Sequence, residues 1–305
     1  MIIRTVLGDI SPEILGVTTC HEHLLWTVPE PYTGEDPDLG FDSVPAAVSE
    51  LRHFKSLGGS ALVEMTTAEI GRAPTELAQI SRAAGVHVIA AAGHHKAKFS
   101  AAALEGQTVE QIAARMIAEI RVGMDGTSIR AGLIKAATSA NTAAESERRV
   151  IRAAGLAHRQ TGAPVSTHTE AGTFAVEQAD LLLEAGVRPE KLCIGHLDRG
   201  LPPQTYRELA ALGVYLGFDQ LGKEKYWPDA ERVRLVVDLI AAGHVRQILL
   251  SGDTARKSAW RVHNPNTQGI GHLLANFQPA LLAAGVSEAD LHCLLVTNPA
   301  EFLAF

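Results

Sequence analysis

Short apolar or β-branched runs alternate with longer stretches rich in Ala, Leu, Glu and Arg along the whole chain. Runs such as Ile248-Leu249-Leu250 are apolar at every position, which is typical of a strand buried on both faces of a parallel sheet. The runs predict eight strands, at Ile14–Thr19, Ser60–Met65, His87–Ala92, Gly132–Ala136, Pro164–His168, Leu192–His196, Val214–Phe218 and Gln247–Gly252. Helices are expected after them, at Val44–Leu57, Glu76–Ala84, Val109–Val122, Ala143–Gln160, Ala175–Glu184, Gln204–Leu212, Ala230–Ala242 and Leu273–Ala284.

This alternation indicates one architecture. Eight strands, each followed by a helix, recur at a period of roughly 30–40 residues, which is the pattern of a (β/α)8 TIM barrel of the α/β class. The alternative, an open doubly wound sheet, is disfavoured because no Gly-x-Gly-x-x-Gly follows an early strand. Since no linker or low-complexity segment divides residues 1–305, we expect one barrel domain over the whole chain.

Composition narrows the class of partner. The chain of 305 residues is 46% hydrophobic and has a formal net charge of −7, which argues against nucleic acid as its main partner. No apolar run reaches the ~18 residues of a membrane span, and the N-terminus lacks the features of a signal peptide. Cys20, Cys193 and Cys293 stand far apart and form no paired motif, which favours a reduced, cytoplasmic setting. A homodimer is the default for a soluble oligomer.

Two histidines follow the first apolar run, in the sequence His21-Glu22-His23. Strand side chains repeat with period two, so both imidazoles point toward one spot beyond the strand. Neutral imidazole is a good ligand for zinc-like metals, and the pair is therefore a candidate metal site. For this motif taken alone, a coincidence of surface or core histidines is the alternative.

Four later strands also end in polar side chains: Lys135, His168, His196 and Asp253, separated by 33, 28 and 57 residues. These gaps correspond to one, one and two barrel units, and the carboxyl ends of barrel strands meet at one mouth. Singly, a strand-end histidine is often structural, and an aspartate after glycine often caps a turn or helix. A lysine inside an apolar strand is costly unless it is paired or neutralised. Together with the histidine pair, these residues predict a shared metal site.

Motifs spread over nearly the full chain, in the expected order, resemble those of the phosphotriesterase family of the amidohydrolase superfamily. They are Gly16-Val17-Thr18 with His21-Glu22-His23, Thr66-Thr67 with Ile70-Gly71-Arg72, Ile134-Lys135-Ala136-Ala137-Thr138, Thr167-His168-Thr169-Glu170-Ala171-Gly172-Thr173, Gly195-His196-Leu197-Asp198, Ser251-Gly252-Asp253 and Thr297-Asn298-Pro299-Ala300. The resemblance implies a TIM barrel that carries a metal-dependent hydrolase acting on ester bonds.

The resemblance also implies a binuclear metal centre. One divalent ion is expected on His21, His23 and Asp253, and the other on His168 and His196. Zinc suits these ligands, and manganese, cobalt or iron suit them as well, because imidazole and oxygen ligation does not discriminate among these metals.

Lys135 is implied to bridge the two ions after carbon dioxide has converted its amine to a carbamate. The reaction needs a neutral amine, and an apolar strand lowers the pKa of a lysine. A hydroxide shared by two metals is then a nucleophile at neutral pH. In the family picture it attacks a carbonyl or phosphoryl centre, and Asp253 transfers its proton to the leaving alkoxide.

The loops beyond the strands suggest a substrate class. Lys225 and Arg256 match in position the pair of the subgroup that hydrolyses phosphorylated sugar lactones, and loops after strands seven and eight often bind phosphate. An ammonium and a guanidinium there suit a phosphate monoester, and solvated helix-start charges are the alternative. The chain departs from that subgroup at Ala259, where a tyrosine is usual. His95 takes the place of another common tyrosine and is a candidate substrate contact.

We therefore expect a lactonase that opens a phosphorylated sugar lactone. Two other readings stay open at this point. Cleavage of organophosphate triesters or acyl-homoserine lactones would favour an apolar pocket over Lys225 and Arg256. A non-catalytic barrel that binds a ligand would not need all six metal-site residues, and every one is present.

Overall fold

Eight parallel strands form the centre of the computed structural model, which describes residues 1–305. Neighbouring strands pair in chain order from β3 to β10, so each strand lies beside the next one in the sequence. Their bounds are β3 Thr18–Glu22, β4 Ala61–Glu64, β5 His87–Gly93, β6 Leu133–Ala137, β7 Val165–His168, β8 Leu192–Ile194, β9 Tyr215–Phe218 and β10 Ile248–Leu250.

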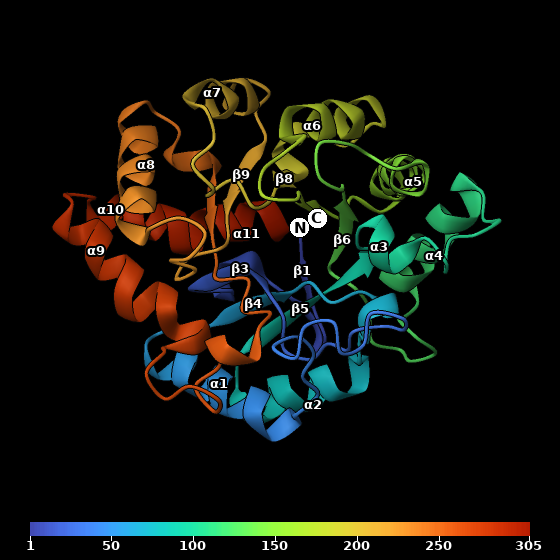
Figure 1. Cartoon of the computed structure of the whole chain (residues 1–305), viewed down its shortest axis with the longest axis horizontal. Helices are drawn as coiled ribbons and strands as arrows, with labels where there is room; N and C mark the ends of the chain where they lie inside the picture. Colours follow the sequence, from blue (N-terminus) through green and yellow to red (C-terminus); the bar gives the residue numbers. More distant parts are fainter.

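Helices surround these strands as a ring in Figure 1. They are α1 Val44–Ser56, α2 Pro74–Ala84, α3 Ala97–Ser100, α4 Val109–Arg121, α5 Glu145–Thr161, α6 Ala175–Glu184, α7 Pro203–Ala211, α8 Asp229–Ala241, α9 Gln278–Ala283, α10 Glu288–His292 and α11 Asn298–Leu303. The ring of helices around a parallel sheet is the (β/α)8 TIM barrel that the sequence predicts, and that prediction is confirmed.

The alternation of strand side chains separates two apolar cores. Leu133 and Leu249 belong to a cluster of 15 buried residues inside the barrel. Ile134 and Leu250, one position along, belong to a cluster of 62 buried residues between strands and helices. Because strand side chains alternate between the two faces, Lys135 shares the face of Leu133 and points into the barrel.

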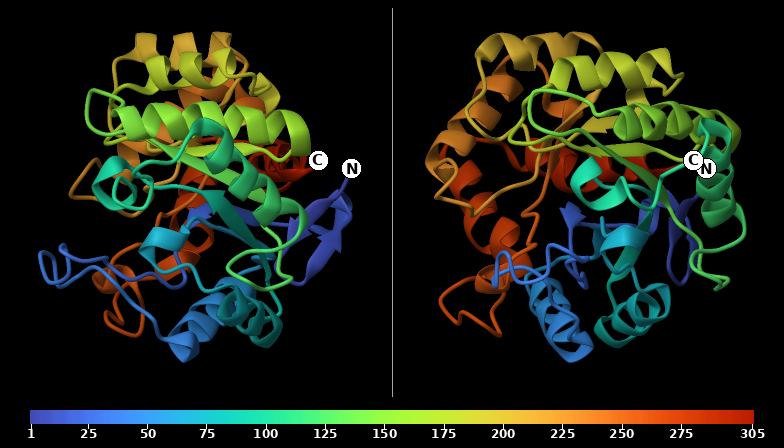
Figure 2. Two further views of the ribbon diagram at one scale, coloured as in Figure 1. Left: turned by 90° about the vertical axis from the view of Figure 1, so that its right-hand side faces the viewer. Right: turned by 45° about the vertical axis from the view of Figure 1, so that its right-hand side comes forward.

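The amino ends of the strands are covered by both ends of the chain. A short hairpin of β1 (Ile3–Thr5) and β2 (Gly8–Ile10) lies there with α11, and Ile3 and Phe302 join the inner core. The N- and C-termini lie side by side in Figures 1 and 2, and Ile2 and Phe305 exchange two backbone hydrogen bonds of 2.9 Å. This end of the barrel is sealed, so access to the interior is from the carboxyl ends.

A serine side chain joins the first and last barrel strands. The Oγ of Ser251 donates to the backbone O of His21 at 2.7 Å and accepts from its backbone N at 2.8 Å. The buried Glu22 accepts from Gly252 N at 2.9 Å and from Thr254 N at 2.8 Å, and its Oε1 lies 2.9 Å from Ser251 Oγ. The end of β3 and the segment after β10 are therefore held together beside the histidine pair.

The elements agree with the sequence predictions except near the ends of the chain and at α3, a four-residue helix that was not predicted. The first strand was expected at Ile14–Thr19, but Ile14 ends a short 3-10 helix and is exposed, and β3 runs from Thr18 to Glu22. The predicted helix Leu273–Ala284 begins as a π-helical segment, Leu273–Phe277. The β1–β2 hairpin, α10 and α11 are too short for hydrophobic periodicity to reveal. No helix has the length and apolar character needed to cross a membrane.

Candidate metal centre and its rim

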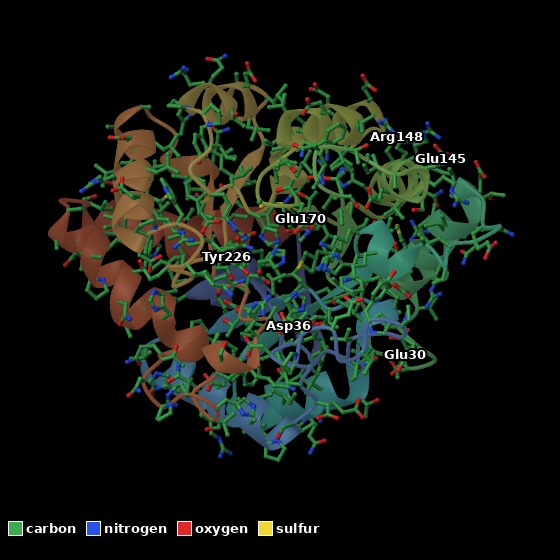
Figure 3. The ribbon with its side chains drawn as sticks, viewed as in Figure 1. Glu30, Asp36, Glu145, Arg148, Glu170 and Tyr226 are labelled. Atoms are coloured by element: carbon green, nitrogen blue, oxygen red, sulfur yellow. The ribbon has the colours of Figure 1, made fainter.

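One cavity of about 190 Å³ opens at the carboxyl ends of the strands. Its lining includes every side chain that the sequence predicts as a metal ligand, here called the ligand cluster: His21, His23, Lys135, His168, His196 and Asp253. Loops that follow the strands complete the walls, and Figure 3 shows the labelled side chains of Glu170 and Tyr226 near the middle of the barrel. Residues far apart in the sequence thus meet at one site.

The imidazoles of the ligand cluster lie against one another. His196 Nε2 is 2.8 Å from His168 Nδ1, and the ring centres of His21 and His196 are 4.9 Å apart. Neighbouring residues of a regular strand face opposite sides, but Cys20 belongs to the inner core and His21 lines the cavity. The register of β3 shifts between Thr19 and Glu22, which accounts for this arrangement. Positive φ angles at His196 (60°) and Asp253 (44°) set the direction of these two side chains where the strands end.

Burial makes three of these imidazoles suitable as ligands. It lowers the pKa of His21, that of His23 further, and that of His168 to about 3. These rings are therefore neutral near pH 7, and the neutral ring is the form that coordinates a metal ion. Ligand atoms of His21, His23 and Asp253 all lie within 4.8 Å of one another, a spacing that a single cation can bridge.

Two nitrogens in the cluster lack a partner. His21 Nδ1 and His168 Nε2 are buried and make no hydrogen bond of good geometry. The carboxylate oxygen near His21 Nδ1 is Asp219 Oδ2 at 3.2 Å, and the one near His168 Nε2 is Glu170 Oε2 at 3.5 Å. A buried polar atom without a partner costs about 1–3 kcal/mol, so such atoms are uncommon without a reason. Neutral imidazoles beside a carboxylate are donors that zinc-like ions prefer. The residues present therefore fit a metal centre.

Asp219 is a member of this site that the sequence analysis missed. It directly follows β9, and its Oδ1 accepts from His196 Nδ1 at 2.6 Å and from His196 N at 2.9 Å. Burial opposes ionisation of Asp219, but the contacts with His196 and His21 outweigh it and hold the pKa of the carboxyl well below its usual value. Asp219 also forms a second possible ligand group with His21 and His196. Asp219 directly follows a predicted strand, and this position could have indicated that its side chain reaches the site.

Lys135 lies deep in the barrel, fully buried. Its Nζ donates to the backbone O of Met65 at 2.8 Å. Burial lowers the pKa of Lys135 to about 8, against the opposing effect of the negative charges of Asp253 and Glu64. The uncharged amine is therefore far more populated near neutral pH than in an exposed lysine, whose pKa is about 10.4.

Glu64, at the end of β4, orients His23 through a threonine. Glu64 accepts from Thr66 N at 2.8 Å, from Thr66 Oγ1 at 2.7 Å and from Leu24 N at 3.0 Å. The same Thr66 Oγ1 lies 2.8 Å from His23 Nδ1. Such contacts behind a ligand fix the orientation of an imidazole ring, so the buried carboxylate has a clear structural role.

The predicted substrate residues are only partly brought together. His95 lines the cavity, with its ring centre 4.7 Å from that of His168. Arg256 also lines it. Lys225 is not among the lining residues, and its ammonium stands 4.9 Å from the ring centre of Tyr226. Lys223, two residues earlier in the same loop, takes a place in the cavity instead.

Four cationic side chains lie above the ligand cluster, here called the rim cations: Lys96, Arg199, Lys223 and Arg256. Three of them are paired with carboxylates. Lys96 contacts Glu170, Lys223 contacts Asp253, and Arg256 Nη1 lies 2.7 Å from Asp36 Oδ2. The rim is therefore strongly polar, with Trp26, Phe99 and Tyr226 as its aromatic members.

A family model described as the Phosphotriesterase family matches residues 1–303. The chain belongs to the phosphotriesterase family. The resemblance read from its motifs is thereby confirmed.

Relatives within the phosphotriesterase family carry hydrolase names. The chain is 34% identical to "Phospho-furanose lactonase" of Mycoplasmopsis synoviae over 99% of its length and 91% of the relative. It is 32% identical to "N-acetyltaurine hydrolase" of Rattus norvegicus over 99% of its length and 98% of the relative. The crystal structure of the lactonase Lmo2620 from Listeria monocytogenes superimposes with a TM-score of 0.94 at 32% identity, covering 100% of this chain and 99% of that one. This member of the family is a hydrolytic enzyme.

Proposed function

We propose that the ligand cluster holds two divalent cations in one catalytic domain spanning residues 1–305. His21, His23 and Asp253 would bind one ion, and His168 and His196 the other. The carbamate of Lys135 would lie between them. The observation that carries this proposal is the convergence of all six ligand-type side chains in one cavity, where buried nitrogens of His21 and His168 make no hydrogen bond.

The chain's own residues would divide the reaction among them. When bound, two divalent cations lower the pKa of a water molecule and polarise the ester carbonyl. Asp253 would take a proton from the attacking water and deliver it to the leaving oxygen. Gln220 Nε2 lies 3.2 Å from Asp253 Oδ2, and Lys223 also contacts this carboxylate, so both hold it in place.

The substrate we propose is a small lactone or ester that carries a negative charge, with a phosphorylated sugar lactone as the leading candidate. The name phospho-furanose lactonase denotes a phosphorylated lactone as substrate, and N-acetyltaurine, named in the other relative, carries a sulfonate. The rim cations favour such a substrate over an apolar triester or acyl-homoserine lactone. Arg256, Lys225 and His95 would contribute to binding it, and the enzyme would act in the cytoplasm, with a homodimer as the default assembly.

A comparison of two substrates tests this function. A 1,4-sugar lactone with and without its 5-phosphate is assayed with the metal-loaded wild-type protein and with Arg256→Ala. We expect the phosphorylated lactone to be hydrolysed with the higher kcat/KM and Arg256→Ala to reduce that preference. Equal kcat/KM values for the two lactones in the wild-type protein would contradict the phosphate assignment. Absence of hydrolysis of either lactone would contradict the lactonase assignment.

A further inference from the structure

Arg199 differs from the other rim cations in having no carboxylate partner. It lies in the segment after β8, three residues beyond His196, and lines the cavity. Its Nε donates to Gln220 Oε1, and the terminal nitrogens Nη1 and Nη2 make no hydrogen bond within the chain. A guanidinium carries five N–H groups and no acceptor. The terminal N–H groups of Arg199 are therefore available to donate to a ligand in the cavity.

The guanidinium of Arg199 is held in a defined orientation. Its central carbon stands 3.7 Å from the ring centre of Tyr226, which is the distance of a face-on cation–π contact. This stacking fixes the plane of the guanidinium and leaves its Nη1 and Nη2 edge open. The Arg199 side chain therefore loses less conformational entropy on binding a ligand than a free lysine side chain would. The site is therefore built before the ligand arrives.

Cationic side chains lie near the ring on which Arg199 stacks. Burial alone would raise the pKa of the Tyr226 phenol, but the charges of Arg256, Lys225 and Lys223 outweigh it and lower that pKa. Burial lowers the pKa of Arg199 itself, because its charge is partly removed from water, and the charges of Asp198 and Asp253 oppose this effect. The cations near Tyr226 favour the approach of an anion to this side of the cavity.

Arg199 is also tied to the predicted reaction centre. Gln220 accepts from Arg199 through Oε1 and donates to Asp253 Oδ2 through Nε2 at 3.2 Å. One glutamine side chain therefore separates the guanidinium from a residue of the ligand cluster. A substrate that contacts both the Arg199 guanidinium and the metal centre at Asp253 would carry its anionic group a few bonds from the carbonyl that is hydrolysed.

We propose that Arg199, stacked on Tyr226, binds the anionic group of the substrate and selects esters or lactones with a phosphate-type oxyanion near the carbonyl. The inference rests on the proposed function and deepens it, because it assigns substrate selection to a residue outside the Lys225 and Arg256 pair. A planar fork offers two parallel N–H donors to two oxygens of such an oxyanion.

Steady-state kinetics on the metal-loaded full chain test this assignment. Arg199→Met is expected to raise KM for the phosphorylated sugar lactone by about ten- to a hundredfold, the loss expected for a hydrogen-bonded charge. KM for the unphosphorylated lactone should stay unchanged, and kcat should change less than KM. Arg207→Met on α7 is the matched control, since Arg207 is exposed, contacts Gln204 and lies outside the cavity. The same KM ratio between the two lactones in Arg199→Met and wild type would overturn the proposal.

Variants that preserve part of the geometry separate recognition from folding. Arg199→Lys keeps the charge without the fork and should recover part of the lost affinity. Tyr226→Phe keeps the stacking surface and should retain the preference for the phosphorylated lactone, whereas Tyr226→Leu should lose much of it. If Tyr226→Leu selects the phosphorylated lactone as well as Tyr226→Phe does, stacking does not orient Arg199.

Calorimetry distinguishes failure of this inference from failure of the proposed function. The probe is a sugar-alcohol phosphate, which has no ester carbonyl to hydrolyse, titrated beside its unphosphorylated alcohol. Arg199-dependent binding of the phosphate supports the inference even if the wild-type protein hydrolyses no lactone. Binding that is equally tight in Arg199→Met places the phosphate elsewhere, for instance on the metal ions, and overturns it.

Discussion

The ligand cluster and the rim cations line the same cavity, but they are supported in different ways. Members of the ligand cluster come from strands or the residues next to them, and buried carboxylates stand behind them: Asp219 behind His196, and Glu64 behind His23 through Thr66. The rim cations come from loops. Arg256 and Lys96 pair with the half-buried carboxylates Asp36 and Glu170, and only Lys223 pairs with a buried carboxylate, that of Asp253.

This difference indicates a division of tasks. A metal centre needs its ligands held to within fractions of an ångström, and strands with buried supporting hydrogen bonds provide that precision. Substrate selection depends on loops, which tolerate sequence change over the same scaffold. Changes in the cluster should therefore affect turnover and metal content, and changes at the rim should affect affinity for particular substrates.

The largest effect is expected from Lys135→Ala. Loss of the bridging group should reduce kcat/KM by about a thousandfold or more, equivalent to about 4 kcal/mol of transition-state stabilisation. Metal content measured by elemental analysis should fall from about two ions per chain, and a short carboxylate added in solution should restore part of the activity. Lys98→Ala, at an exposed pair with Glu35, is the control. Full activity of Lys135→Ala without an additive would remove the carbamate from the mechanism.

Asp219→Asn should have the next largest effect. The amide cannot stabilise His196 as the carboxylate does, and loss of a partner behind a ligand typically costs about 10- to 100-fold in metal affinity or activity. Competition with a chelator measures the metal affinity, and Asp238→Asn on the exposed side of α8 is the matched control. An unchanged metal affinity would show that Asp219 does not support the centre.

Ser251→Ala tests the junction of the first and last strands. It removes the hydroxyl that donates to His21 O, accepts from His21 N and lies 2.9 Å from Glu22 Oε1. We expect the free energy of unfolding to fall by about 1–2 kcal/mol, because buried groups lose their partners. Urea denaturation measures the change, with Ser56→Ala at the exposed end of α1 as the control. Equal stability of the two variants would contradict the structural role of Ser251.

The smallest effect is expected at the rim, and it should be a gain. Asp36→Asn removes the carboxylate that pairs with Arg256, so Arg256 becomes more available to an anionic substrate. A partly exposed ion pair contributes about 0.2–1 kcal/mol, which corresponds to a decrease in KM of about 1.4- to fivefold for the phosphorylated lactone. Asp42→Asn in the same loop should leave KM unchanged. A higher KM in Asp36→Asn would show that the Asp36 pair positions Arg256 for binding.

Much of the barrel could be predicted because its strands are short apolar runs at a regular spacing. The rule that polar side chains at strand ends converge was sufficient to find Lys135 and His168. The same rule applies to Asp219, directly after Phe218, but the aspartate belongs to no recognisable motif. Lys223 and Lys225 both stand in one loop, and periodicity gives no information about which of them faces the cavity.

The sequence by itself determined the order of the barrel units, the apolar faces of the strands and the residues able to bind a metal, because these follow from local alternation and from the chemistry of each side chain. The tertiary structure decided which of the rim cations pair with a carboxylate. Arg256 meets Asp36 from a loop more than 200 residues earlier, whereas Arg199 meets the ring of Tyr226 and no carboxylate. Such pairings depend on how loops from different strands fold over one mouth, and no local pattern in the chain encodes that arrangement.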